Sequence, residues 1–177
     1  MDHRTSTEVA PDGTVTQRID HPGVAALKEL KDYQVAAGDP DVRGWQVYAS
    51  DGRRIGQVDE LLVDTAAMKV RYLDVGLDRD LFAGDGPGEP ASPVRNVLLP
   101  IGSAHLDQAE DRVTVDLLHT LIGDLPAYGH GPVSREYEDA VRQRFARGPR
   151  DTPERDYYAG DLYDDERFYG PRRRRSQ

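Results

Sequence analysis

The residue types that most often carry catalysis or bind metal ions are sparse in this sequence. There is no cysteine, which excludes a thiolate metal site, a cysteine nucleophile and a disulfide framework. The histidines are scattered without the i, i+3 or i+4 spacing that brings two ligands to one metal ion. They are His3, His21, His105, His119 and His130. The serines belong to no nucleophile motif, and no phosphate-binding or zinc-protease motif is present. The sequence therefore predicts a protein that is not an enzyme and that binds no metal ion or other cofactor directly.

Charged residues flank one short turn near the middle of the chain. Asp64 ends a long apolar stretch, Thr65–Met68 form the turn, and Arg71 lies in the stretch that follows. An aspartate at the start of a turn commonly accepts hydrogen bonds from the backbone N–H groups just after it. On the residues alone, Asp64 is therefore interpreted as a turn residue.

Six apolar stretches predict the strands that position this turn. They are Trp45–Tyr48, Arg54–Asp64, Val70–Leu77, Arg95–Pro100, Ser103–Leu106 and Arg112–Leu117. Asp51-Gly52 separates the first two stretches, at a position where a hairpin requires residues that tolerate positive φ. The chain therefore begins its sheet with two tightly connected strand pairs.

The phase of the apolar residues also predicts local shape. Val113 and Val115 alternate with polar neighbours, so this strand turns one face to the core. Ile55 and Val58 are out of phase by one residue, which predicts a β-bulge near Gln57–Asp59. Because a bulge lets a small sheet bend, we expect a mainly β fold whose strands form a small barrel.

Composition divides the chain into four regions. They are a flexible leader with a short helix at 1–37, a barrel at 38–120, a connector with a C-terminal helix at 121–147, and a charged, Tyr- and Arg-rich tail at 148–177. In the first region, Asp20 or His21 can cap a helix whose Val24, Leu27 and Leu30 share one side. That apolar side predicts packing on the barrel or on another subunit.

The C-terminal helix is predicted from Ser134 to about Ala146. Ser134 can cap it, and Tyr137, Val141 and Phe145 form an apolar stripe that should lie on the barrel. The leader and the tail contain too little apolar surface for a core of their own, and we expect both to be flexible.

Charge and hydropathy narrow the possible partners. The net charge of −9 over 177 residues argues against nucleic acid, whose phosphates usually require a basic surface. No stretch approaches the roughly 20 apolar residues needed to span a bilayer. We therefore expect a cytoplasmic protein.

The stretch Gly84–Pro93 contains too much glycine and proline for a helix or strand and is expected to be an exposed loop.

Three short motifs carry a family resemblance. Ala37–Gly44 precede the first hairpin, Arg71–Val75 follow the second, and Val97–Pro100 continue in the same order. These motifs resemble the PRC-barrel, the domain shared by the cytoplasmic part of the photosynthetic reaction-centre H subunit and the ribosome-maturation factor RimM. They are more similar to the H subunit, and the resemblance covers roughly residues 33 to 120.

The resemblance implies a subunit that docks on the L and M type membrane subunits of a reaction centre and stabilises its quinone side. Asp64 and Arg71 match residues of the family's proton route, but the family's glutamate three residues after the aspartate is Ala67 here. The H subunit's membrane helix is also missing, so protein contacts would hold the barrel in place. Peripheral membrane association is a further possibility, through Arg172 and Arg173 at anionic headgroups, although such a cluster can simply be solvated.

Arg43, Trp45 and Tyr48 are the other predicted contact residues, together with the loop at 84–93. Two alternatives stay open. The first is a free-standing, self-associating PRC-barrel of stress or housekeeping type. The second is a RimM-like role in ribosome assembly, but the short polar N-terminal region cannot form RimM's additional barrel.

Overall fold

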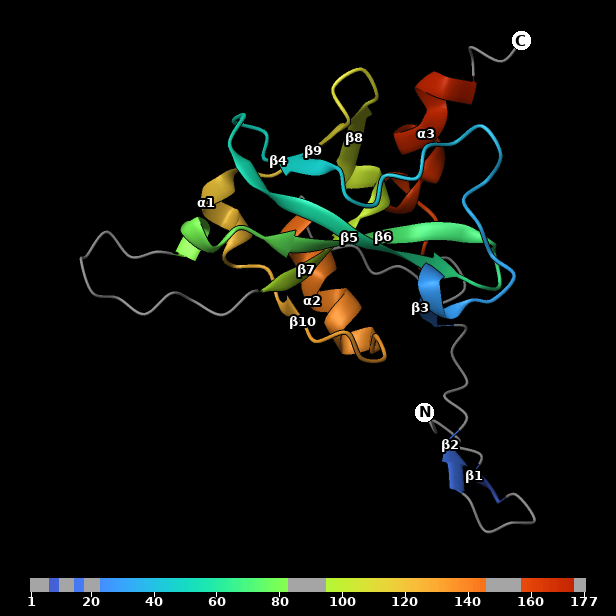
Figure 1. Ribbon diagram of the computed structural model, residues 1–177. Coiled ribbons are helices and arrows are strands. Elements are labelled where there is room, and N and C mark those ends of the chain that lie inside the picture. The colour runs from blue at the N-terminus through green and yellow to red at the C-terminus, as the bar shows by residue number, and fades with distance from the viewer. Residues whose placement is uncertain (1–6, 10–14, 18–22, 83–94, 146–156, 174–177) are drawn as a thin grey trace.

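The computed structural model describes residues 7–9, 15–17, 23–82, 95–145 and 157–173 (Figure 1). Its main element is one eight-stranded sheet. In spatial order the path runs β10 (Ala127–Tyr128), β7 (Asn96–Pro100), β6 (Lys69–Leu77), β5 (Arg54–Asp64), β4 (Gln46–Tyr48), β9 (Arg112–Val115) and β8 (Ala104–Asp107), and β3 (Val24–Ala26) pairs with β5 off this path. The short strands β1 (Thr7–Val9) and β2 (Val15–Gln17) form a separate antiparallel pair.

Strand β5 organises the sheet because it pairs with different neighbours along its length. Its first half pairs with β4, its last residues pair with β3, and β6 follows it from end to end. The register against β6 shifts between Val58 and Glu60, so the bulge predicted near Gln57–Asp59 is confirmed. At Gly56, an added Cβ would lie 2.0 Å from the carbonyl oxygen of Gly76, so only glycine permits this close approach of two strands.

The predicted mainly β fold is confirmed, and the predicted strands all occur with small shifts at their ends. The sheet is bent rather than closed, because the strands at the ends of its path, β10 and β8, are not paired with each other among the described residues. The parallel pairing of β4 with β9 brings the last part of the domain beside the first hairpin.

Apolar residues fill both faces of the central strands. The larger core includes Leu61, Leu73 and Leu99, and the second core contains Leu62, Tyr72 and Leu98 from the same three strands. Since neighbouring residues on a strand point to opposite faces, the alternation assigns each residue to one core. The end of β5 is consequently buried on both faces.

The predicted N-terminal helix is wrong. Val24–Ala26 form β3, which pairs with Asp64, Val63 and Leu62 of β5, and Leu27–Glu29 form a single 3-10 turn, η1. Strand β4 does not pair with β5 beyond the bulge, so the backbone groups there need other partners. Pairing with them stabilises Val24–Ala26 as a strand more than a short isolated helix would. Leu27 still packs on the domain, with 5% of its surface exposed.

The predicted C-terminal helix is confirmed as α2 (Arg135–Phe145), and the Ser134 hydroxyl accepts a hydrogen bond from the Tyr137 N–H at 3.2 Å. Its buried Val141 joins the second core. The remaining helical elements are α1 (His119–Ile122), α3 (Asp165–Arg173) and the 3-10 turns η2 (Arg79–Phe82), η3 (Ile101–Ser103) and η5 (Asp161–Tyr163).

The expectation of a flexible C-terminal tail is wrong for residues 157–173. This part forms η5 and α3, which lie against η3, β6 and β8 (Figure 1). Tyr163, Phe168 and Tyr169 each expose 2% of their surface or less. The composition of the tail predicts no core of its own, but these aromatic side chains complete the two cores of the sheet. The predicted leader at 1–19 and the loop at 84–93 lie largely outside the described residues.

Candidate functional site

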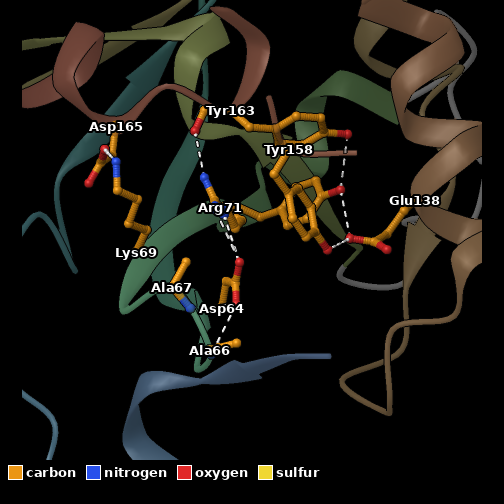
Figure 2. Close-up of polar contacts among 10 residues, drawn as sticks. Asp64, Ala66, Ala67, Lys69, Arg71, Glu138, Tyr158, Tyr163 and Asp165 are labelled. Carbon is orange, nitrogen blue, oxygen red and sulfur yellow. Dashed lines mark hydrogen bonds and ion pairs between the residues drawn. The ribbon is translucent and has the colours of Figure 1, made fainter. Parts of the chain in front are cut away.

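Asp64 and Arg71, the two predicted proton-route residues, form a buried ion pair at the end of the β5–β6 hairpin (Figure 2). The guanidinium donates to Asp64 Oδ2 through Nε at 3.2 Å and through Nη2 at 3.1 Å. The other carboxylate oxygen, Oδ1, accepts from the backbone N–H groups of Ala66 and Ala67 at 3.0 and 3.1 Å. Asp64 therefore fixes its own turn, as its position in the sequence predicted, and also holds Arg71 in the sheet.

Arg71 extends this site toward the C-terminal residues. Its Nη1 donates to the carbonyl oxygen of Tyr163 at 3.2 Å, and its guanidinium carbon lies 4.7 Å from the centre of the Tyr158 ring. A guanidinium over a tyrosine ring is attracted by the ring's negative face. One arginine thus joins a turn of the sheet to residues more than 80 positions later in the chain.

Tyr72 and Glu138 form the second part of the site, on the face of the sheet that α2 covers. The Tyr72 hydroxyl lies 3.0 Å from Glu138 Oε1 and 3.1 Å from the Tyr163 hydroxyl. The Tyr158 hydroxyl also donates to Glu138 Oε1 (Figure 2), and Arg135 donates to Oε2 at 2.9 Å. Both oxygens of this buried carboxylate are therefore satisfied, as a buried charge requires.

Burial is the largest influence on the pKa values of Glu138, Tyr72 and Tyr163. It raises the pKa of Glu138 above its usual value, and the hydrogen bond from Tyr158 and the charge of Arg135 oppose that rise. Burial also raises the pKa of Tyr72 and of Tyr163. These phenols therefore stay protonated as hydrogen-bond donors over the physiological pH range.

The tyrosines pack against one another as well as against cations. The Tyr163 ring lies 5.5 Å from Tyr72 and 5.1 Å from Tyr158 in edge-to-face geometry. The Arg135 guanidinium lies 3.9 Å from the centre of the Tyr157 ring, and the Tyr157 hydroxyl donates to Asp139 at 2.8 Å. The arrangement cross-links β6, α2 and the C-terminal residues without exposing a reactive group.

A smaller polar cluster lies across β5, β6 and β7. The amide nitrogen of Asn96 donates to Asp74 at 2.8 Å and to Asp59 at 2.9 Å, and His130 Nε2 lies 3.3 Å from Asp74. Asp74 is 2% exposed, and its burial raises its pKa. Asp59 occupies the β5 bulge, which explains how a residue of that strand reaches Asn96.

The predicted partner-contact residues lie apart from the Asp64–Arg71 pair along the chain and are partly engaged within the domain. The Arg43 guanidinium forms an ion pair with Asp41, and its Nη1 lies 3.4 Å from Glu60 Oε1. Trp45 packs partly buried against the larger core, and Tyr48 lies under the guanidinium of Arg112 at 5.0 Å. Arg172 and Arg173 belong to the last turn of α3, and their side chains lie outside the described part of the chain.

Three histidines have acidic partners at separate places in the domain. His105 pairs with Asp116, His119 with Asp51, and His130 with Asp74. Among the described residues, no three acidic, histidine or cysteine side chains are grouped so that they could hold a metal ion. That no cofactor binds directly stays a prediction.

Sequence reasoning missed the aromatic residues of the tail and their partner Glu138. The available signal was the density of tyrosines at positions 157, 158, 163 and 169 in a segment that is otherwise rich in charged residues. Tyrosine is amphipathic and usually buries its ring while its hydroxyl finds a partner, so such a run can indicate a docked segment.

The protein is a small, mainly β domain built on a bent sheet, and the buried polar groups described above bind one another within the domain. Comparison with known families agrees, because residues 35–122 match the family described as PRC-barrel domain. Residues 35–122 therefore form a PRC-barrel domain, and domains of this family are in general not enzymatic. In the described part of the chain no helix is both long and apolar enough to cross a bilayer.

Proposed function

We propose that the protein is a non-catalytic PRC-barrel subunit that docks on the cytoplasmic face of a photosynthetic reaction centre, as an H-subunit-like domain. The observation that carries the proposal is the PRC-barrel match over residues 35–122, together with the Asp64–Arg71 pair at positions where the sequence resembles the H subunit. The proposed location is therefore cytoplasmic and peripheral to the photosynthetic membrane.

The region around β4 supplies the proposed contact surface. Trp45 and Tyr48 are aromatic, partly exposed and close in sequence, and Arg43 exposes 35% of its side chain. Interfaces are enriched in tryptophan, tyrosine and arginine because these side chains bury much area for little lost conformational entropy. These residues can therefore serve as anchors for the L and M type subunits.

Assistance to proton delivery is the second part of the proposal, and Asp64 is its candidate. In the free chain Asp64 exposes 5% of its surface, so a proton would have to enter through the groups around it. Ala67 at the family's glutamate position removes one such group. If Asp64 takes part, Asp64→Asn slows the proton-coupled second reduction of the secondary quinone, whereas an unchanged rate restricts the protein to a docking role.

The docking role is tested by affinity purification of the tagged full chain from gently solubilised membranes of its native host. We expect bacteriochlorophyll absorbance and the L and M type subunits in the eluate. Trp45→Ala should reduce this yield, and Leu121→Ala, which changes an exposed side chain of α1, should not. A colourless eluate that contains only this chain would contradict the proposal and favour the self-associating barrel.

A further inference from the structure

The residues Tyr157–Tyr169, here called the C-terminal segment, are held to the domain through side chains. The backbone hydrogen bonds of Tyr163, Asp164 and Arg167 are local, to Gly160, Asp161 and Asp164. The segment therefore differs from the strands of the sheet, whose backbones are paired with one another. It behaves as a folded peptide that is bound to a surface.

That surface combines positive charge with aromatic and small residues. Lys69 Nζ lies 3.2 Å from Asp165 Oδ1, and Arg71 donates to the Tyr163 carbonyl at 3.2 Å (Figure 2). At Gly102 an added Cβ would lie 1.8 Å from the carbonyl oxygen of Asp161, so the backbone of the segment rests directly on η3. Shape and charge together make this a specific binding surface for the segment.

We propose that the C-terminal segment of one copy also binds this surface on a second copy, so that two chains exchange segments and complete each other's site. The exchanged contacts are the same as those within one chain, including the Lys69–Asp165 and Arg71–Tyr163 contacts. Exchange of an identical element is a low-cost route to a closed, two-fold symmetric dimer, because no new complementary surface has to evolve.

The length of the connection permits the exchange. Residues 146–156 lie between the end of α2 and the segment. A chain of that length reaches at most about 40 Å, which is comparable to the width of a small domain, so it can extend to a neighbouring copy. A copy whose segment has left uncovers Tyr72, whose ring and hydroxyl contact Tyr163, and a second copy carries an identical segment that fits there.

The direct test uses the unmodified chain. Equal amounts of 14N- and 15N-labelled protein are incubated together and treated with a carbodiimide, which joins a lysine to a carboxylate in contact with it. The chain has three lysines, Lys28, Lys31 and Lys69, so the Lys69–Asp165 link is readily identified by mass spectrometry. In a fully exchanged dimer about half of these links join a light to a heavy peptide, because partners are drawn at random.

The mixed-isotope links should increase with protein concentration, as should the mass measured by light scattering, from 19.7 kDa toward twice that value. Mixed links at Lys28 and Lys31 measure the background from random collisions. If the Lys69–Asp165 links contain one isotope only at all concentrations, the segment is bound only within its own chain and the proposal is overturned.

A charge-reversal mixture gives a second test. Copies with Lys69→Glu are mixed with copies with Asp165→Lys, so that opposite charges meet only when the segment binds the other copy. We expect a dimer in the mixture that is several-fold more abundant than in either variant alone. The matched control mixes Arg54→Glu with Asp78→Arg, a surface ion pair of 3.5 Å outside the segment. An equal amount of dimer in both mixtures would contradict the exchange.

Discussion

Gly102→Ala tests whether the C-terminal segment is part of the folded domain. The ideal Cβ at this position lies 1.8 Å from the carbonyl oxygen of Asp161 and 2.7 Å from the carbonyl carbon of Leu162. Both atoms belong to the backbone, so rotation of a side chain cannot relieve the clash. The segment has to move away from η3 by roughly 1.5 Å to restore ordinary van der Waals contact.

The cost of that movement follows from what the segment buries. Tyr163 and Phe168 are 1% exposed and lie in the two different cores of the sheet, so a shift disturbs the packing of both. Overpacking of a well-packed site costs about 1–3 kcal/mol, and we expect the upper half of that range here. For a chain of this size the melting temperature should fall by about 4–12 °C.

Two measurements check this prediction. Urea unfolding followed by circular dichroism gives the free energy, and hydrogen exchange with mass spectrometry shows where protection is lost. We expect faster exchange in the segment and little change in β5 and β6. Gly129→Ala is the matched control, because an added Cβ there meets nothing within 4 Å. Equal stability and equal protection in the two variants would refute the assigned packing of the segment.

Three further predictions concern the site and its helix. Arg71→Met should lower the free energy of unfolding by about 3–5 kcal/mol, because it leaves the buried Asp64 without its cation; a double-mutant cycle with Asp64→Asn, measured by urea unfolding, isolates the pair. Burial raises the pKa of Glu138 above 4.5, so its contribution to stability is complete below that pH and is lost as the pH rises through the folded-state pKa. Glu138→Gln should therefore remove this decrease in the free energy of unfolding, measured by urea unfolding between pH 4 and 8. An unchanged pH dependence would contradict the raised pKa of Glu138. Ser134→Ala should cost about 1 kcal/mol of stability in thermal unfolding through loss of the cap on the Tyr137 N–H, with less helical signal from α2.

Local sequence patterns determined much of the sheet. The alternation around Val113, the Asp51-Gly52 turn and the phase change after Ile55 each depend on residues close in the chain, and each predicted its strand, hairpin or bulge correctly. The same is true of α2, whose cap and apolar stripe lie close together between Ser134 and Phe145.

Tertiary structure decided the cases in which a local pattern fits two conformations. The apolar residues from Val24 to Leu30 suit a short helix, but the open edge of β5 provides backbone partners and makes Val24–Ala26 a strand. Sequence could propose Asp64 and Arg71 separately, whereas their ion pair depends on the register of the β5–β6 hairpin.

The sequence by itself thus determined the class of fold, the positions of strands β4–β9 and the residues of the central turn, because these depend on short-range periodicity and turn chemistry. Only the tertiary structure decided that the C-terminal segment packs on the domain. Its tyrosines cannot form a core within the segment itself. Their burial depends on Arg71, Tyr72 and Glu138, which come from β6 and α2. A pattern within one segment cannot specify a surface that the rest of the chain has to build.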